Sequence, residues 1–275
     1  MKKHFWPLIL ILIFAVAASV GCGDSGYADE EFSVLAVQVG KADALILYTV
    51  DSCVLIDTGE DGDADKILSE LERLGKKRAD AVILTHFDKD HIGGADKILA
   101  GLEVGRVIMP DSRENSADYR ELISALDKAG INPEMPAKKT EFTLGGAKYE
   151  VYPSEKESYE KDSDNNISLV TFVSYGETRF LFSGDAEGGR LDEIMSLGDV
   201  SCDYIKLPHH GGYNKRTESF LTAADPEYAV ITDSGKKPAD PRTESVLYRL
   251  GTEIYSTRNG NVLAVSDKKT IRMIQ

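Results

Sequence analysis

The chain has 275 residues, of which 42% are hydrophobic and 28% charged, the proportions of an ordinary soluble globular protein. These proportions argue against a disordered chain, and we find no repeat at solenoid spacing. The formal net charge is −14 at pH 7, which removes the usual electrostatic surface of a nucleic-acid-binding protein. Nucleic acid is therefore a disfavoured partner, and a phosphate-bearing substrate would have to be attracted locally, by metal ions.

The first residues have the layout of a secretion signal. Lys2 and Lys3 precede an apolar run from residue 8 to residue 20, which ends in small residues. The run is shorter than the roughly 20 residues that a membrane-spanning helix needs. A cleaved signal peptide is therefore favoured over the alternative, an uncleaved helical anchor.

The four residues Ser19-Val20-Gly21-Cys22 resemble a bacterial lipoprotein cleavage box, although Ser19 replaces the usual Leu. The resemblance implies that Cys22 is acylated and anchors the protein at the cell membrane, outside the cytoplasm. The implied organisation has three parts: a lipoprotein signal peptide over residues 1–21, a lipid anchor and spacer over residues 22–31, and a folded domain over residues 32–275.

Two further cysteines, Cys53 and Cys202, follow in the folded domain. An even pair in an oxidising compartment could form a disulfide. Each cysteine also begins an apolar strand, where buried free thiols are common. We expect two buried thiols.

Apolar periodicity and turn residues predict alternating strands and helices along the whole domain. In the first half, strands are expected over residues 32–39, 44–50, 53–56, 81–84 and 106–109, with helices over 64–74, 95–102 and 119–129. In the second half, strands are expected over 149–152, 168–175, 179–183, 204–207, 228–232, 253–255, 261–265 and 270–273, with helices over 188–197, 218–223 and 243–250. The polar run 154–166 is expected to be a mobile loop. Strands interleaved with helices, without a linker, predict one α/β domain of two packed sheets with helices outside.

Potential metal ligands gather in two loops that follow apolar strands. The first loop carries His86, Asp88, Asp90 and His91, and the second carries the pair His209 and His210. Imidazole and carboxylate groups bind borderline and hard divalent cations. Four histidines confined to two such loops therefore predict a metal site.

Two other carboxylates also follow strands. Asp185 follows Gly184, which lets the backbone approach closely, so its carboxylate could reach a metal ion. Alternatively, it could cap the following helix. Asp57, in Asp57-Thr58-Gly59, is expected to support a histidine ligand rather than bind metal itself.

Five motifs, taken in order, resemble the metallo-β-lactamase fold superfamily, and more narrowly the hydrolase domain of the ComEC-like competence proteins of DNA uptake. The motifs are Val39-Gly40-Lys41-Ala42-Asp43, Leu55-Ile56-Asp57-Thr58-Gly59, the loop from His86 to His91, Ser183-Gly184-Asp185, and His209-His210-Gly211. The narrower resemblance rests on Asp88 in place of the usual second His, on the run 165–170, and on the paired histidines. The resemblance implies an α/β fold, an αββα sandwich of two mixed β-sheets with helices on the outer faces.

The resemblance also implies a centre of two divalent metal ions, zinc or manganese. The implied first site consists of His86, Asp88 and Asp185, and the implied second site of Asp90, His91, Asp185 and one of His209 and His210. The chain lacks the third histidine that relatives add to the first site, and Asn166 or Ser168 is expected near its place. An oxygen-rich first site favours manganese or magnesium more than a histidine-rich site does. Asp240, where the DNA-uptake relatives commonly carry His, is a second departure.

The implied activity is hydrolysis by a secreted, lipid-anchored, metal-dependent phosphodiesterase or nuclease. Asp90 would orient the attacking hydroxide, and His210 or His209, whichever is not a ligand, would protonate the leaving oxygen. Asn166 and Ser168 would donate hydrogen bonds to the developing oxyanion. Lys215 and Arg216 could attract a substrate phosphate, although ordinary surface charge is the favoured interpretation. The alternatives are a carboxyl-ester or lactone hydrolase on the same fold and a non-catalytic, metal-stabilised binding lipoprotein.

Overall fold

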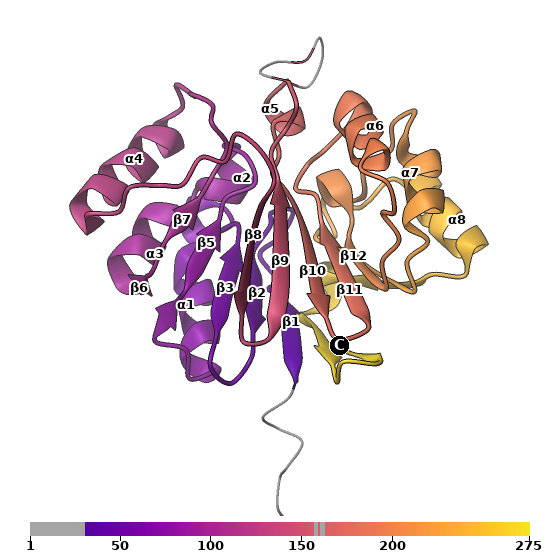
Figure 1. Ribbon diagram of the computed structural model, residues 1–275, viewed down its shortest axis with the longest axis horizontal. Helices are drawn as coiled ribbons and strands as arrows, with labels where there is room; N and C mark the ends of the chain where they lie inside the picture. The colour runs from indigo at the N-terminus through magenta and orange to yellow at the C-terminus, as the bar shows by residue number, and fades with distance from the viewer. Residues whose placement is uncertain (1–30, 157–158, 160–162) are drawn as a thin grey trace, which may run out of the picture.

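The structure is a computed structural model that describes residues 31–156, 159 and 163–275. Two β-sheets of seven strands each pack face to face, and helices cover the outer face of each sheet (Figure 1). The predicted αββα sandwich is therefore confirmed. The predicted signal peptide, Cys22 and most of the spacer lie outside the described residues. In the part of the chain that the structure describes, no helix has the length and apolar character needed to cross a bilayer.

The first sheet has the strand order β16-β15-β1-β2-β3-β5-β7. Its strands are β1 (Phe32–Ala36), β2 (Leu45–Tyr48), β3 (Cys53–Ile56), β5 (Ala81–Ile83), β7 (Val107–Ile108), β15 (Val262–Ser266) and β16 (Ile271–Ile274). Strands β3, β5 and β7 are parallel, and the other pairings are antiparallel. The helices on its outer face are α1 (Ala64–Arg73), α3 (Ala95–Gly101) and α4 (Ala117–Ala129) (Figure 1). The connections also hold η2 (Asp61–Asp63), α2 (Lys89–Ile92) and a small parallel pair, β4 (Arg78–Ala79) and β6 (Glu103–Val104).

The second sheet has the strand order β14-β13-β12-β11-β10-β9-β8. Its strands are β8 (Thr140–Leu144), β9 (Ala147–Tyr152), β10 (Val170–Tyr175), β11 (Thr178–Phe182), β12 (Tyr204–Lys206), β13 (Tyr228–Ile231) and β14 (Glu253–Ser256). The helices that cover it are α6 (Gly188–Ser196), α7 (Thr217–Ala224) and α8 (Pro241–Leu250) (Figure 1). Shorter turns of helix are α5 (Ser163–Asn166), η3 (Pro208–Gly211) and η4 (Thr257–Asn259).

The main core lies between the two sheets. Its largest side chains, all buried, are Phe32, Tyr149, Phe180, Phe182 and Tyr204. Burying each large apolar side chain contributes about 1.5–3 kcal/mol, and this contact fixes the two sheets relative to each other. A second apolar cluster lies between the first sheet and its helices, and a third lies between the second sheet and its helices. Cys53 and Cys202 are buried and free, so the prediction of two thiols is confirmed.

The structure adds elements that the sequence did not predict. Strand β8 was missed because it is an edge strand with alternating half-buried and exposed positions, joined to β9 by two glycines with positive φ, Gly145 and Gly146. The short helix α2 lies inside the loop predicted to bind metal. The polar run 154–166 ends in helix α5 rather than continuing as a loop, and residues 157–158 and 160–162 of it lie outside the described residues.

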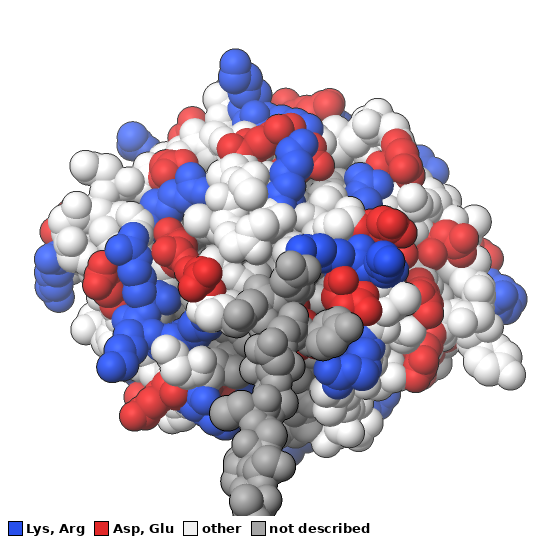
Figure 2. All heavy atoms as spheres, turned by 60° about the horizontal axis from the view of Figure 1, so that its bottom comes forward, with Lys and Arg blue, Asp and Glu red and all other residues white. Residues whose placement is uncertain are grey.

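The carboxyl ends of four strands lie at one end of the sandwich, near α2 and α5, at the top of Figure 1. These strands are β3, β5, β11 and β12. Strand β1 begins at the opposite end. Figure 2 brings that opposite end forward and shows basic and acidic side chains interspersed over it. The described residues visible on this face therefore form no continuous basic surface of the kind that binds nucleic acid.

Candidate metal centre

The loop after β5 is shaped by one turn of helix. The backbone N–H groups of His91 and Ile92 donate to the carbonyl oxygen of Asp88, at 2.9 and 3.0 Å. This turn brings His91 back beside His86, so that the centroids of the two buried imidazole rings lie 4.0 Å apart. Two potential ligands from one short loop therefore face the same point.

Close backbone packing joins this loop to the one after β3. Thr58 donates to the carbonyl oxygen of His91 from its backbone N–H and from its hydroxyl, at 2.7 and 3.0 Å. A Cβ atom on Gly94 would lie 2.4 Å from the carbonyl oxygen of Thr58, so no larger residue fits there. The two loops are thus fixed in mutual register.

Asp185 reaches the cluster from the second sheet. Gly184, which precedes it, has a φ of +52°, and a Cβ atom there would lie 2.7 Å from Cβ of Thr85 and 2.8 Å from Oγ of Ser168. The turn can pass this close only with glycine. Oδ1 of Asp185 lies 3.2 Å from Nε2 of His91, and Oδ2 lies 3.3 Å from Nε2 of His210. The carboxylate stands between two histidines, as a bridging ligand would.

The structure separates the roles of the paired histidines. Both have left-handed backbone conformations, with φ of 47° for His209 and 52° for His210. His210 is buried, and its Nε2 lies 3.5 Å from Oδ2 of Asp90. His209 is about one-third exposed: its Nε2 lies 3.9 Å from Oδ2 of Asp185, and its Nδ1 contacts Glu187. His210 therefore belongs to the ligand cluster, whereas His209 lies at its edge.

The cluster has the donors that a divalent cation needs. Ligand atoms of His86, His91 and Asp185 all lie within 4.8 Å of one another, as do those of Asp90, His91 and His210. Asp88 joins at the mouth, with Oδ2 3.7 Å from Nε2 of His86.

Several of these atoms are buried without a hydrogen-bond partner: Nε2 of His86, His91 and His210, and Oδ1 of Asp185. An unsatisfied buried polar group costs about 1–3 kcal/mol. Metal coordination would remove that cost, so the residues fit bound divalent cations.

Asp57 supports His91 as the sequence predicted. Its Oδ2 lies 2.7 Å from Nδ1 of His91, and its two oxygens accept from the backbone N–H and the hydroxyl of Thr85, each at 2.7 Å. The carboxylate thus fixes the imidazole ring with Nε2 directed into the cluster.

Asp43, whose role the sequence did not predict, gives His210 the same kind of support. Its Oδ1 lies 3.3 Å from Nδ1 of His210 and accepts from the hydroxyl of Thr232 at 2.6 Å. Its Oδ2 contacts Lys206, which was also missed. A charged residue at the end of strand β12, between buried Ile205 and Leu207, was the signal that could have identified Lys206.

The carboxylates dominate the electrostatics of the metal-free cluster. Burial lowers the pKa of His91 and of His210, but nearby carboxylates outweigh this effect. Asp185 and Asp57 raise the pKa of His91 well above its usual value, and Asp185 and Asp43 raise the pKa of His210 to about 10. Burial raises the pKa of Asp90, yet His210 and His91 lower it to about 2. A metal ion would therefore displace protons from the histidines when it binds.

Asn166 and Ser168 lie beside Asp185. The Ser168 hydroxyl donates to the carbonyl oxygen of Asn165 at 2.6 Å and accepts from the backbone N–H of Asp185 at 3.2 Å. Oδ1 of Asn166 accepts from the backbone N–H of Glu187 at 2.9 Å. These bonds position the turn that carries Asp185, and a direct role toward an oxyanion stays a prediction.

The remaining sequence candidates lie on the surface. Lys215 is exposed, and exposed Arg216 forms an ion pair with Asp192 at 2.9 Å, which favours ordinary surface charge. Asp240 caps helix α8. Its carboxylate accepts from the backbone N–H of Arg242 and forms an ion pair with the guanidinium group of Arg242. The carboxylate of Asp240 is therefore used to cap the helix and is not one of the candidate metal ligands.

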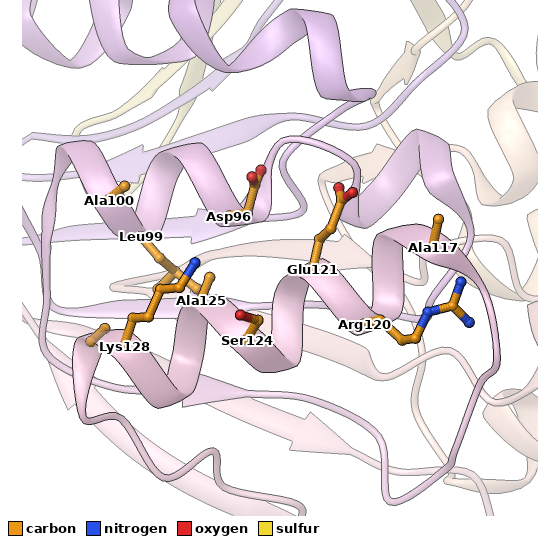
Figure 3. Close-up of a pocket in the computed structure, with 10 residues that line it drawn as sticks. Asp96, Leu99, Ala100, Ala117, Arg120, Glu121, Ser124, Ala125 and Lys128 are labelled. Carbon is orange, nitrogen blue, oxygen red and sulfur yellow. The ribbon is translucent and has the colours of Figure 1, made fainter.

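Two cavities differ in their relation to the cluster. Figure 3 shows a groove of about 600 Å³ between α3 and α4, lined by Asp96, Leu99, Arg120, Glu121 and Lys128 among others. None of its lining residues belongs to the cluster. A second cavity, of about 360 Å³, is lined by Ser112, Pro153 and Ile167 among others. Among its lining residues, Ile167 is the sequence neighbour of the candidate site residues Asn166 and Ser168.

Comparison with known proteins assigns the family. Residues 38–232 match the model of the metallo-β-lactamase superfamily, and the chain belongs to this family. It therefore has the hydrolase fold of that superfamily, with candidate metal ligands at the expected end of the sandwich.

Three of the curated relatives are competence proteins, which confirms the narrower resemblance, and a fourth is a hydroxyacylglutathione hydrolase. The chain is 28% identical over 159 residues to ComE operon protein 3 of Bacillus subtilis (strain 168), covering 58% of this chain and 20% of that protein. It is 24% identical over 253 residues to competence protein ComA of Neisseria gonorrhoeae, covering 89% of this chain and 32% of that protein. The chain thus spans about a fifth and about a third of these two relatives.

A solved structure shares the fold. The metallo-β-lactamase fold protein YhfI from Bacillus subtilis superposes with a TM-score of 0.58 at 11% identity, covering 88% of this chain and 100% of that chain. At this identity the likeness describes the fold alone.

Proposed function

We propose that this protein is a metal-dependent hydrolase of phosphodiester bonds. The observation that carries the proposal is the buried carboxylate of Asp185, which stands between His91 and His210 with one oxygen toward each. In this arrangement one carboxylate can serve two cations. Two divalent cations would supply the charge that neutralises a phosphate and activates the attacking water.

The candidate ligands form two sets, and Asp185 belongs to both. We assign His86, Asp88 and Asp185 to the first ion, and Asp90, His91, His210 and Asp185 to the second. The first set is the more open because Asp88 is 46% exposed at the mouth, whereas His91 and His210 are buried. The open side is where a substrate oxygen would enter. Asp90, on the side of His210, would orient the attacking water.

His209 is the group that would protonate the leaving oxygen. Its Nδ1 contacts the carboxylate of Glu187, which also accepts from Nδ2 of Asn165 at 3.1 Å. The ring is therefore fixed with Nε2 toward the cluster, and it remains partly exposed where a leaving group would depart. The sequence left open which histidine has this role, and the geometry favours His209 for it and His210 as the ligand.

The substrate is proposed as a phosphodiester because two of the most similar relatives are competence proteins. Paired cations also suit the anionic oxygens of a phosphate that is esterified twice. The net charge of −14 favours a small or cell-wall phosphodiester over a long nucleic acid. We further propose that the enzyme acts outside the cytoplasmic membrane, tethered through Cys22.

The soluble chain from Gly23, supplied separately with Mn²⁺ and Zn²⁺, tests this function. We expect cleavage of bis-p-nitrophenyl phosphate, weaker cleavage of single-stranded DNA, and no cleavage of a chromogenic lactam or ester. Asp90→Ala should abolish turnover, whereas Asp192→Ala, a surface carboxylate in an exposed ion pair, should retain it. Ester cleavage without phosphodiester cleavage would overturn the proposed substrate. Metal binding without any turnover would indicate a binding protein.

A further inference from the structure

A buried lysine lies under the candidate metal centre. Lys206 is the last residue of β12, a central strand of the second sheet, and its side chain is fully buried. Lysine is almost never fully buried unless it is paired, because removing an ammonium group from water costs several kcal/mol. Its position therefore calls for a specific set of partners.

Three oxygens from two loops surround the ammonium group. Nζ of Lys206 contacts Oδ2 of Asp43 and lies 3.2 Å from the carbonyl oxygen of Gly184 and 3.6 Å from Oδ1 of Asp185. An ammonium group has three hydrogen-bond donors and no acceptor. Lys206 thus joins the loop before β2, which supports His210, to the turn that carries the bridging carboxylate.

Lys206 lies in a cluster that is rich in carboxylates. Five carboxylates belong to it, namely those of Asp43, Asp57, Asp88, Asp90 and Asp185. Among the ion pairs of the described residues, Lys206 is the one Lys or Arg that reaches any of these carboxylates.

We propose that Lys206 is a positioning residue that keeps the ligand cluster assembled before metal binds. Its ammonium group holds Asp43 beside His210 and draws Oδ1 of Asp185 toward the floor of the site, so that neither carboxylate repels the other. The inference rests on the proposed metal centre, but it needs no assumption about the substrate.

The test compares metal-free and metal-loaded unfolding of the soluble chain. In Lys206→Met, which keeps the length of the side chain and removes its charge, we expect the midpoint of the chelated protein to fall by about 10 °C or more. With saturating Mn²⁺ or Zn²⁺, the fall should be less than half as large, because the cations then compensate the carboxylates. Lys76→Met is the matched control: Lys76 binds carbonyl oxygens of the loop after β2, so its effect should not depend on metal.

A second variant keeps the inference testable if Lys206→Met folds poorly. Asp43→Asn/Lys206→Met removes both charges of the pair and should recover much of the metal-free stability lost in Lys206→Met. Equal losses with and without metal in Lys206→Met, or no recovery in the double variant, would overturn the inference. A wild-type chain that is stabilised by metal but cleaves no phosphodiester would contradict the proposed function alone.

Discussion

Backbone strain is concentrated at the residues of the candidate site. Asp57, His209 and His210 are three of the five non-glycine residues with positive φ in the described part of the chain. Each such conformation costs about 1–3 kcal/mol and persists only where the surrounding structure enforces it. The left-handed pair at His209 and His210 lets two adjacent imidazoles contact the cluster from different sides. The strained backbone conformations therefore occur where the surrounding structure fixes the positions of candidate site residues.

The Glu187–His209 pair gives a prediction for catalysis. Glu187→Gln removes the charge that orients the His209 ring, so we expect kcat on a phosphodiester to fall by about tenfold to a hundredfold. Metal affinity should change little because the side chain of Glu187 bonds to His209 and Asn165, neither of which is an assigned ligand. Steady-state kinetics with Glu177→Gln, an exposed control, measures the difference. An unchanged kcat would exclude His209 as the proton donor.

The two thiols give a prediction for reactivity. Burial raises the pKa of Cys53 to about 12 and raises the pKa of Cys202 still further from its usual value. Because the thiolate is the reactive form, an aromatic disulfide reagent at pH 8 should label neither cysteine in the native chain from Gly23. The unfolded chain should release about two equivalents. Rapid labelling of the native protein would contradict the buried placement of both residues.

At the scale of elements, one arginine fastens helix α6 to the strands beside the site. Arg190 is buried and donates to the carbonyl oxygen of Ser168 at 3.2 Å, to that of Tyr152 at 2.7 Å, and to Glu193 at 2.9 Å. These bonds tie the start of α6 to the end of β9 and to the residues before β10. Helix α6 thereby holds the segment that carries Ser168 against Asp185.

This arrangement predicts a large loss of stability when the arginine is removed. Arg190→Met removes the buried cation of the pair with Glu193 and the hydrogen bonds to the carbonyl oxygens of Ser168 and Tyr152. The free energy of unfolding should therefore fall by about 3–5 kcal/mol, although Glu193 keeps its hydrogen bonds from Tyr159 and Glu155. Arg216→Met, which breaks an exposed pair with Asp192, should change it by less than about 1 kcal/mol. Urea denaturation of both variants measures the contrast. Similar losses would show that Arg190 does not fasten the helix.

At the scale of the whole molecule, the candidate site and the start of the folded domain lie at opposite ends of the sandwich (Figure 1). A lipid group at Cys22 would therefore leave the site directed away from the anchor. We expect full-length protein in the membrane fraction and Cys22→Ser in the soluble fraction. Fractionation with fatty-acid labelling tests this, and an unlabelled protein that stays with the membrane would contradict the lipid anchor.

The sequence predicted most of the sandwich because its buried strands are short apolar runs bounded by turn residues. Strand β8 was missed because an edge strand with charged, half-exposed positions lacks that pattern. The ligands could be predicted because they follow strand ends in recognisable motifs. Asp43 and Lys206 could not be paired, because they come from opposite halves of the chain and meet only when the two sheets pack.

Metal content is the most direct test of the central claim, that Asp185 bridges two cations. The chain from Gly23 would be equilibrated with Mn²⁺ or Zn²⁺, and bound metal measured by mass spectrometry beside Asp185→Asn and the surface control Asp240→Asn. We predict about two ions per chain for the wild type and the control, and at most about one for Asp185→Asn. No bound metal in the wild type, or unchanged stoichiometry in Asp185→Asn, would contradict the account.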